Sequence, residues 1–442
     1  MTKAAHIVEI RDLAHGGAGV GRVVDSEESR VCFVEGALPG ERVRVALDAE
    51  HKRWLRGHVL EVLTPAPERV EPPCPIADRC GGCSWQHVDP AAQARFKGQI
   101  VAGQLRRITK SADHEPPVVP SPKPLGYRRR ARVHYRREAQ AEGGLVLGFF
   151  GHRSHEIVDN RRCIVLEPAL DWAVQQLRRW VEHLPDRGEV HGLTNGTEVV
   201  LGLPGVRHSP ELEAAIRELI EGSASGESPG ILVGVQLRGG RERVGVGRTW
   251  LELDAHGPLP PVVQGPFTFS QAQAGQNAAL VEHVVAMARP QDRRVLELHA
   301  GVGNFTRALA RVAKRVWTVD GDREAVASLQ RSVERWGLSI NPKRGQAEIL
   351  LGKLAAGKRH YDVVVCDPPR AGIGEQAARD LIRVATRRIV YVSCDPATLA
   401  RDLAVMTAEG SPFDLVDLRV FDMMPMTAEV EVVAVLERAR DD

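Results

Sequence analysis

The sequence has no apolar run that approaches the ~20 residues of a membrane span, and no signal peptide stands at its start. It also lacks a strong charge of either sign, because 59 lysines and arginines offset 57 aspartates and glutamates to leave +2. These absences predict a soluble, cytoplasmic protein without a membrane partner, and we expect a monomer. With 442 residues, 43% of them hydrophobic, the chain can bury a substantial core and should divide into about two to four domains.

Cysteine is also scarce, and the seven cysteines are an odd number in a chain without secretion signals. This argues against a disulfide framework and for metal binding or catalysis. Cys74, Cys80 and Cys83 lie close together, and a Gly-Gly pair between the last two leaves the backbone free to fold around an inorganic centre. Such a cysteine knot can hold zinc or an iron–sulfur cluster, both of which usually need four ligands. Of the other cysteines, only Cys163 and Cys394 lie outside strand-like apolar contexts.

The residue pattern divides the chain into three parts. Residues 1–65 alternate in β fashion with glycine punctuation, which predicts a small closed barrel of the kind that grips nucleic acid. A proline-rich linker leads into residues 66–260, a central β-rich part that contains the cysteine knot and a predicted helix at residues 91–108. We expect this helix to pack on the third part, residues 261–442, where helix and strand alternate as in a parallel α/β sheet.

The central part carries a run of arginines between Tyr127 and Arg137, with six arginines and two tyrosines. Guanidinium groups beside aromatic rings suit phosphates and base faces, so the run is a candidate nucleic-acid contact. The alternative is a solvated, charged strand. We take four members as the candidate RNA-binding residues: Arg128, Arg129, Arg130 and Arg132.

In the C-terminal part, the strand ends carry residues suited to binding a ligand: Gly301, Asp320, Asp367 and Cys394. Ligands of such sheets bind at the carboxyl ends of the strands. Gly301 lets the backbone approach a ligand closely, and Asp320 is placed to bind ribose hydroxyls. A dinucleotide-binding fold would look similar, but Phe305 replaces the third glycine of its fingerprint and the acidic Glu297 precedes the loop. Both features favour S-adenosylmethionine over NAD.

Cys394 follows a short apolar strand, and Asp395 with Pro396 is set to begin the next helix. The positive end of a helix dipole favours a thiolate over a thiol, so Cys394 is a candidate nucleophile. Asp367 opens an Asp-Pro-Pro turn that, in methyltransferases of exocyclic amines, is followed by a stacking aromatic residue. Arg370 stands in place of that aromatic residue. Asp367 is therefore free to bind a base edge, and the alternative is that it only caps the strand end.

Several motifs, spread over nearly the whole chain, occur together. The C-terminal part contains Asn304-Phe-Thr306, Asp367-Pro-Pro-Arg-Ala-Gly372, Tyr391-Val-Ser-Cys394, Pro396-Ala-Thr-Leu-Ala-Arg401 and Asp422-Met-Met-Pro425. Upstream lie Gly126-Tyr-Arg-Arg-Arg-Ala-Arg132, Gly19-Val-Gly21 and Phe33-Val-Glu-Gly-Ala-Leu-Pro-Gly-Glu41. Together they resemble the RNA uracil-C5-methyltransferase family, and the last two are similar to a TRAM domain, a small RNA-binding β-barrel. The cysteine spacing matches the members that carry a [4Fe–4S] cluster.

This resemblance implies an α/β fold: a Rossmann-like class I methyltransferase domain with an N-terminal TRAM or OB-like barrel and a central β-rich domain that holds the cysteine knot. It implies that Cys394 adds to carbon 6 of a flipped uridine, that Asp367 contacts the base, and that Glu431 is the general base that removes the proton from carbon 5. The activity implied is transfer of a methyl group from S-adenosylmethionine to that carbon, in structured RNA.

The resemblance also assigns binding residues. The methyl donor would contact Gln271, His299, Gly301, Asn304, Asp320, Gln346 and Asp367. Phe269 would stack on the target base. The four ligands of a [4Fe–4S] cluster, structural rather than redox-active, would be Cys74, Cys80, Cys83 and Cys163. The barrel and the cluster favour ribosomal RNA over transfer RNA as the partner.

The chain departs from the family pattern at a few positions. Family members commonly carry histidines before the general base, where this chain has Met426 and Glu429, and Gln346 stands where an Asp or Asn often contacts the donor. Two other functions therefore stay open: a base-amine or cytosine-C5 RNA methyltransferase on the same fold, and a non-catalytic iron–sulfur RNA-binding protein. The sequence does not identify the RNA or the uridine.

Overall fold

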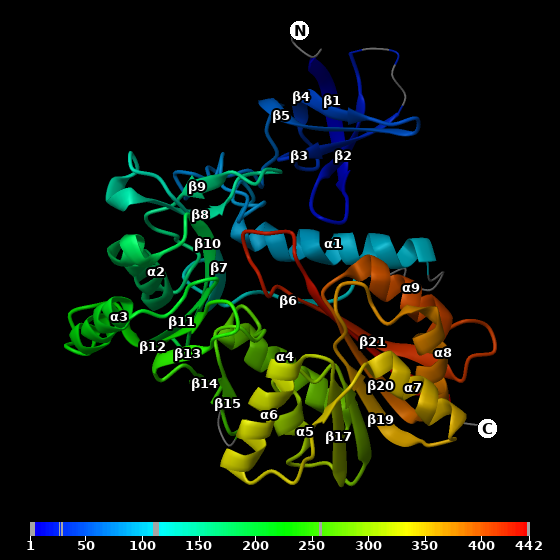
Figure 1. The fold of residues 1–442 in the computed structure, drawn as a ribbon. Helices are drawn as coiled ribbons and strands as arrows, with labels where there is room; N and C mark the ends of the chain where they lie inside the picture. The colour runs from blue at the N-terminus through cyan, green and yellow to red at the C-terminus, as the bar shows by residue number, and fades with distance from the viewer. Residues whose placement is uncertain (1–4, 26, 28–29, 109–114, 256–258, 440–442) are drawn as a thin grey trace.

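The computed structural model describes residues 5–25, 27, 30–108, 115–255 and 259–439. Figure 1 shows three parts: a barrel of blue strands at the top, a cyan-to-green central part on the left, and a green-to-red α/β part below and to the right. Among the described residues, no helix is long and apolar enough to cross a membrane.

The N-terminal part is a closed five-stranded barrel with the strand order β1-β2-β3-β5-β4. Its strands are β1 (Ala5–Leu13), β2 (Gly19–Val23), β3 (Val31–Glu35), β4 (Arg42–Glu50) and β5 (Trp54–Thr64). Side chains alternate across a strand, and the fully buried Val8, Val34 and Val43 fill the interior. Gly21 is needed where β1 and β2 meet, because a Cβ there would lie 2.2 Å from the backbone oxygen of Glu9. The predicted N-terminal barrel is confirmed.

The helix α1 (Pro90–Ile108) follows the cysteine-rich segment and runs beneath the barrel (Figure 1). It packs on α9 (Pro396–Met406) and on β21 (Phe413–Phe421). Its fully buried Lys97 donates through Nζ to Asp422 Oδ1 at 2.5 Å. A buried charge is tolerated only when it is paired, so this ion pair fixes α1 to the C-terminal part.

The central part is a seven-stranded sheet with the order β13-β12-β11-β10-β7-β8-β9, covered by two α-helices and a 3-10 helix. Its elements are β7 (Arg130–Arg137), η1 (Glu142–Gly144), β8 (Leu145–Phe150), β9 (Ile157–Asp159), α2 (Pro168–Gln175), η2 (Gln176–His183), β10 (Arg187–Thr194), β11 (Glu198–Pro204), α3 (Pro210–Ser223), β12 (Ile231–Arg238) and β13 (Val244–Gly247). The pair β14 (Leu251–Leu253) and β15 (Val262–Gln264) then leads into the C-terminal part. The predicted β-rich character of this part is confirmed.

The C-terminal part is an eight-stranded sheet with the order β18-β17-β16-β19-β20-β22-β21-β6. Besides β21, its strands are β6 (Val118–Val119), β16 (Arg294–Leu298), β17 (Arg315–Asp320), β18 (Lys343–Arg344), β19 (Tyr361–Cys366), β20 (Ala385–Ser393) and β22 (Glu431–Arg438). The strands from β18 to β20 pair in parallel, whereas β22 runs antiparallel to both of its neighbours. The parallel strands therefore end at one edge of the sheet, where ligands of α/β sheets bind.

Helices cover both faces of this sheet. One set is α4 (Ala274–Ala288), α5 (Thr306–Leu309) and α6 (Arg323–Trp336), and the other is α7 (Ala347–Ala356), α8 (Gly374–Val384) and α9. Buried residues of β16 alternate between two hydrophobic clusters: Val295 packs with α4 and α5, and Leu296 with α7, α8 and α9. This layering confirms the predicted Rossmann-like class I methyltransferase fold.

The C-terminal sheet also recruits a strand from upstream of the central part. Val118 and Val119 of β6 pair in parallel with Val420 and Phe421 of β21. The sequence pattern placed these two residues inside the central part, because a two-residue strand has no periodicity to reveal it. The catalytic sheet is therefore built from two separate stretches of the chain.

Candidate active site

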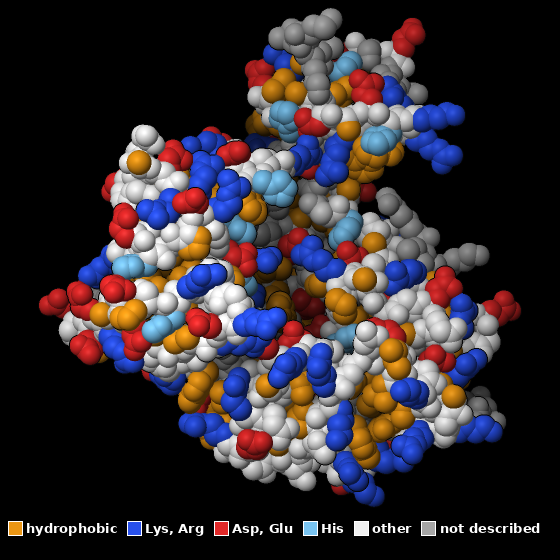
Figure 2. All heavy atoms as spheres, viewed as in Figure 1, with side chains coloured by type: hydrophobic (Ala, Val, Ile, Leu, Met, Phe, Trp, Pro, Cys, Tyr) orange, Lys and Arg blue, Asp and Glu red, His pale blue; other side chains and the backbone are white. Residues whose placement is uncertain are grey.

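A cavity of about 580 Å³ opens at the carboxyl edge of the C-terminal sheet. Most of the predicted site residues line it: Arg129, Arg130, Phe269, Gln271, His299, Gly301, Asn304, Asp320, Asp367, Cys394 and Glu431. Figure 2 shows the surface hollowed where the three parts of the molecule meet. Residues from four strand ends and from the segment before α4 thus converge on one space.

One half of the cavity is formed by the loop after β16. Gly301 and Gly303 have φ values of +56° and +96°, which favour glycine, and a Cβ on Gly303 would lie 2.5 Å from Leu329. The Gly301 N–H donates to Asp320 Oδ2 at 2.8 Å, so the loop and the end of β17 are joined. Asn304 and Asn277 of α4 exchange two amide hydrogen bonds of 2.9 Å each. The loop is therefore fixed before any ligand binds.

Buried acidic groups lie at and behind the wall of this half: Asp367 lines the cavity, and Glu297 is buried in β16 next to it. Burial raises the pKa of Glu297 to about 8, with Asp367 and Asp320 adding to the shift against the hydrogen bond from Thr306. Burial, then the charge of Asp320, raises the pKa of Asp367 to about 7. In addition, Glu297 Oε1 is buried without a hydrogen-bond partner among the described residues. Buried carboxyl groups of this kind are stabilised in their ionised form by a nearby cation, so the residues present fit a cationic ligand such as a sulfonium.

The other half of the cavity brings a thiol beside a carboxyl group. Burial raises the pKa of the Cys394 thiol to about 12; Glu431 adds to this, and Arg370 opposes it. The expectation that the following helix would favour the thiolate is therefore wrong for the free protein. Burial and the neighbouring carboxyl groups outweigh the helix terminus, where the N–H groups of Ala397 and Thr398 already donate to Asp395 Oδ1.

Glu431 is the first residue of β22 and is 5% exposed. Burial, then the charges of Asp367 and Glu429, raises its pKa well above the ordinary value. Its Oε1 atom is buried without a hydrogen-bond partner among the described residues. A carboxyl group that is held by few side-chain contacts depends on the backbone for its position.

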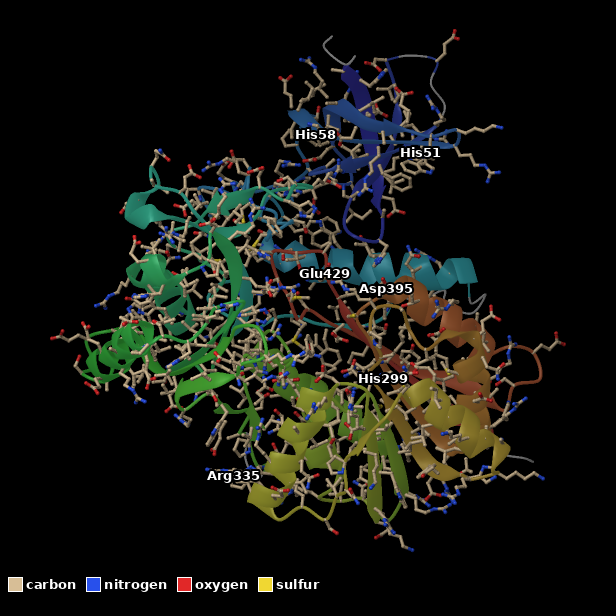
Figure 3. The ribbon with its side chains drawn as sticks, in the orientation of Figure 1. His51, His58, His299, Arg335, Asp395 and Glu429 are labelled. Carbon is tan, nitrogen blue, oxygen red and sulfur yellow. The ribbon has the colours of Figure 1, made fainter. Side chains whose placement is uncertain are left out.

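An ion pair lies at the mouth of the cavity. Arg370 Nη2 approaches Glu429 Oε2 at 2.6 Å, and the two side chains are 67% and 38% exposed. Figure 3 labels Glu429 beneath α1, with Asp395 close to it and His299 lower in the C-terminal part. This pair joins the Asp-Pro-Pro turn to the segment before Glu431, and sequence analysis found Glu429 only as a departure from the family pattern.

Some predicted residues lie elsewhere. Gln346 is exposed as the N-cap of α7 and does not line the cavity. Arg132 is 61% exposed on β7, where Glu189 lies 3.9 Å away, as expected for a solvated strand. Arg128 lines the cysteine cavity described below. Phe269 is 66% exposed at the cavity mouth, and Gln271 is buried.

Arg129 lines the cavity but is largely committed to other protein groups. It is 2% exposed, its Nη1 and Nη2 bind both carboxylate oxygens of Asp254 at 2.5 and 2.9 Å, and its Nε donates to the backbone oxygen of Gln271. Arg130 donates to the backbone oxygen of Thr268. Asp254 also accepts a hydrogen bond from Asn277, and sequence analysis missed it because no motif surrounds it.

The four predicted cluster ligands line a second cavity, which lies in the central part. Cys74, Cys80, Cys83 and Cys163 surround it together with Phe149 and Arg128. None of these cysteines forms a disulfide in the described chain. No group of three or more His, Cys, Asp or Glu side chains in the described residues is close enough to hold a single metal ion. The four cysteines thus line one space.

The fold and the cavity define a class I methyltransferase, and comparison with known proteins narrows the class. A family profile described as tRNA (uracil-5-)-methyltransferase matches residues 263–439, and a TRAM domain profile matches residues 7–60. The 23S rRNA (uracil(1939)-C(5))-methyltransferase RlmD of Edwardsiella ictaluri is 34% identical, over 99% of this chain and 97% of its own length. An uncharacterized RNA methyltransferase of Streptomyces avermitilis is 35% identical, over 98% of each chain.

The chain therefore belongs to the RNA uracil-C5-methyltransferase family, and it is an S-adenosylmethionine-dependent RNA methyltransferase. Its fold is also that of the Pyrococcus abyssi tRNA (uracil-54, C5)-methyltransferase in complex with S-adenosyl-L-homocysteine, with a TM-score of 0.73 at 22% identity over 98% of this chain and 99% of that one. The family predicted from the motifs is confirmed.

Proposed function

We propose that this protein methylates carbon 5 of one uridine in ribosomal RNA through a covalent bond between Cys394 and carbon 6. The observation that carries the proposal is that Cys394, Glu431 and Asp367 line the same cavity as the glycine loop after β16. Ribosomal RNA is the preferred substrate because relatives that cover nearly the whole chain are named as 23S rRNA methyltransferases. Transfer RNA is the second candidate.

The residue types fit the chemistry. S-adenosylmethionine supplies an electrophilic methyl group on a cationic sulfur, and carbon 5 of uracil is too weak a nucleophile to take it unaided. Cys394 Sγ, as the thiolate, bonds to carbon 6, and the displaced electron pair makes an enolate that is nucleophilic at carbon 5. After methyl transfer, the Glu431 carboxylate takes the proton from carbon 5, the double bond between carbons 5 and 6 re-forms, and the thiolate leaves.

Ionisation of these groups is coupled to binding. Burial raises the pKa values of both Cys394 and Glu431, which disfavours their charged forms. A cationic donor held beside Asp367 would lower the pKa values of the nearby acids, because it would stabilise their charged forms. We infer that Gln271, His299, Gly301, Asn304 and Asp320 contact the donor, and that Asp367 contacts both donor and base. Gln346, also predicted to contact the donor, does not line the cavity.

We propose that the RNA is held by all three parts. Residues 1–65 bind its backbone, the exposed Phe269 stacks on the flipped base, and Arg130 and Arg132 contact phosphates beside it. Residues 66–260 and 261–442 form the central and catalytic parts, with α1 and β6 attached to the latter.

We propose that Cys74, Cys80, Cys83 and Cys163 hold a [4Fe–4S] cluster. The support is that these four cysteines line one cavity and that four thiolates are the usual ligand set of such a cluster. When bound, the cluster would cross-link the cysteine segment to the segment after β9 through the cysteine thiolates. Methyl transfer moves no net electrons, so this role is structural. Absorbance near ~400 nm after anaerobic purification, lost in Cys163→Ser, tests the assignment.

A labelling experiment tests the function. The protein is incubated with labelled methyl donor and either 23S ribosomal RNA or transfer RNA, and the nucleosides are digested and separated. The expected product is 5-methyluridine from ribosomal RNA, lost in Cys394→Ala but kept in Cys32→Ala, which removes a thiol from the barrel core. Label in adenine, guanine or cytosine, or full activity of Cys394→Ala, would contradict the proposal.

A further inference from the structure

The segment 422–430, between β21 and β22, delivers Glu431 to the cavity and is held from outside the catalytic sheet. Its first contact is the buried pair of Lys97 with Asp422, and Lys97 Nζ also donates to the backbone oxygen of Met424 at 3.0 Å. The Tyr127 hydroxyl donates to the backbone oxygen of Pro425 at 2.9 Å. α1 and the start of the central part therefore fix the beginning of the segment.

Met426 is the most constrained residue of this segment. Its φ is +64°, in the left-handed region that disfavours a residue with a side chain. Gln93 Oε1 of α1 accepts its N–H at 2.7 Å, and its carbonyl accepts the N–H of Trp85 at 2.9 Å. Both polar backbone groups of Met426 are thus satisfied by residues more than 300 positions away in the sequence.

The same contacts reach the cysteine segment. Ser84 and Trp85 directly follow Cys83, and Ser84 Oγ accepts the N–H of Ala428 at 3.3 Å. Fully buried Gln93 joins the two sides, because its Nε2 donates to the backbone oxygens of Trp85 and Val88 at 3.3 and 3.0 Å. Gln93 therefore clamps the cysteine segment and the segment before Glu431 together.

We propose that Gln93 and Ser84 are positioning residues for Glu431, so that the cysteine segment and α1 set the geometry of the general base. Glu431 Oε1 has no hydrogen-bond partner among the described residues, and its position follows the backbone of segment 422–430. This inference rests on the proposed function. The contacts of Gln93 and Ser84 affect the removal of the proton from carbon 5. The attack of Cys394 on carbon 6 does not depend on them.

The separation of steps gives a direct test. In Gln93→Ala, Cys394 still bonds to carbon 6 and carbon 5 still receives the methyl group, but elimination slows by about 10- to 100-fold, as for a reacting group displaced by about 1 Å. The methylated protein–RNA adduct therefore accumulates and is seen as a shifted band on a denaturing gel. Ser84→Ala, a change at an exposed side chain, is expected to show the same effect more weakly. Gln99→Ala on the same helix is the matched control.

The outcomes separate the two proposals. If the wild type makes no 5-methyluridine, the proposed function itself is wrong. If the wild type is active, equal loss of adduct and product in Gln93→Ala, with Ser84→Ala unchanged, would overturn the positioning role. Adduct accumulation in both variants, with an unchanged KM for RNA, supports it.

A different observation carries a second inference. A groove of about 580 Å³ lies at the opposite edge of the C-terminal sheet, where β19 and β20 begin. Five arginines line it against the carboxylates of Asp362 and Glu437: Arg289, Arg293, Arg387, Arg388 and Arg438. Arg388 donates to the backbone oxygen of Met287, and Arg438 to those of Ile382 and Ala385, so two of the guanidinium groups are fixed in place.

We infer that this groove binds the phosphate backbone of RNA far from the target uridine. An excess of arginine over carboxylate suits phosphates. Arg388 is 6% exposed and bound to Glu437, so the phosphate contacts fall to the exposed Arg289 and Arg387 and the half-buried Arg293. The nine residues of β20 separate the groove from Cys394 by roughly 30 Å at 3.3 Å per residue. Only an RNA with extended structure can reach both sites.

Binding measurements at several salt concentrations test this. In a triple Arg289→Ala, Arg293→Ala, Arg387→Ala variant, affinity for 23S ribosomal RNA should fall and the salt slope should drop by about one per lost phosphate contact. Affinity for a short hairpin with the target uridine should not change. Arg217→Ala with Arg379→Ala, at exposed helix sites elsewhere, is the control. Unchanged affinity and slope for the long RNA, or an equal loss for the hairpin, would overturn the inference.

Discussion

The two halves of the catalytic cavity are built in different ways. The donor half comes from one domain, where Gly301 and Asp320 follow neighbouring parallel strands and bind each other directly. The half with Cys394 and Glu431 depends on distant segments, since Gln93 and Trp85 hold the backbone before Glu431. The donor half is thus preformed by local topology. The half with Cys394 and Glu431 forms only when the cysteine segment, α1 and the catalytic sheet are assembled. Changes in one half should therefore leave the other half working.

The largest expected effect separates chemistry from donor binding. Cys394→Ala should lower methylation by on the order of 10⁴-fold or more, since no other thiol lines the cavity among the described residues. Donor affinity, measured by calorimetry, should stay within about twofold because Cys394 belongs to the other half. A large loss of donor affinity would show that the two halves are not independent.

The next largest effect concerns the Lys97–Asp422 ion pair, which anchors the segment before Glu431. Lys97→Met leaves Asp422 buried without its cation and should destabilise the protein by about 3–5 kcal/mol in chemical unfolding. Adding Asp422→Asn should recover part of this, because no uncompensated charge then remains. Lys353→Met, in the last turn of α7, is the control for loss of a lysine. Equal stability of single and double variants would argue against a net ion-pair contribution.

Asp320→Ala should affect only the donor half. It removes the acceptor of the Gly301 N–H and the proposed acceptor for ribose, each a hydrogen bond to a charged group. Donor affinity should fall by about 10- to 100-fold by calorimetry. Formation of the covalent adduct with 5-fluorouridine RNA depends on donor binding, whereas RNA affinity does not and should be unchanged. A loss of RNA affinity would contradict the division.

The raised carboxyl pKa values give a smaller, pH-dependent effect. Asp367 and Glu297, with pKa values of about 7 and about 8, are ionised only above these values in the free protein. Donor affinity should therefore fall as the pH drops from 8.5 to about 6, because the cation meets neutral acids. The free energy of unfolding of the free protein should change in the opposite direction and fall as the pH rises. A raised folded pKa contributes stability that is lost as pH rises toward it. Thermal unfolding measured with and without the donor across this pH range checks both the donor affinity and the stability of the free protein.

The smallest effect concerns the ion pair at the cavity mouth. Glu429→Gln removes a charge that raises the pKa of Cys394, so the thiol should react faster with iodoacetamide at a given pH. Stability should change by less than about 1 kcal/mol, because both side chains are largely exposed. Glu375→Gln, an exposed pair on α8, is the control. An unchanged alkylation rate would show that Glu429 does not influence the thiol.

The same contrast explains what the sequence could predict. Apolar strands that end on Gly301, Asp320 and Asp367 identify the donor half, because adjacent parallel strands bring their ends together. The expected thiolate at Cys394 was wrong because burial and Glu431 raise the pKa of this thiol. Both depend on the tertiary fold, so the sequence around Cys394 carries no signal of them.

Other features had no local signal. Arg129 looks like its neighbours in the arginine run, but it lies just before β7 and turns inward to Asp254, whose position depends on the tertiary fold. The contacts of Gln93 and Ser84 join residues more than 300 positions apart, and no periodicity encodes such pairs. Cys163 was predicted as the fourth cysteine of the group from the family resemblance, because it lies far from the other three in the sequence.

The two-residue strand β6 has a consequence for how the molecule is divided. Since Val118 and Val119 already pair with β21, the chain visits the catalytic sheet, leaves to build the central part, and returns to complete the sheet. The central part is therefore an insertion within the catalytic fold, with both of its ends at the same host. A fragment that began at residue 261 would leave the edge of β21 unpaired and lose α1, and we expect it to associate through that edge rather than fold as a smaller enzyme.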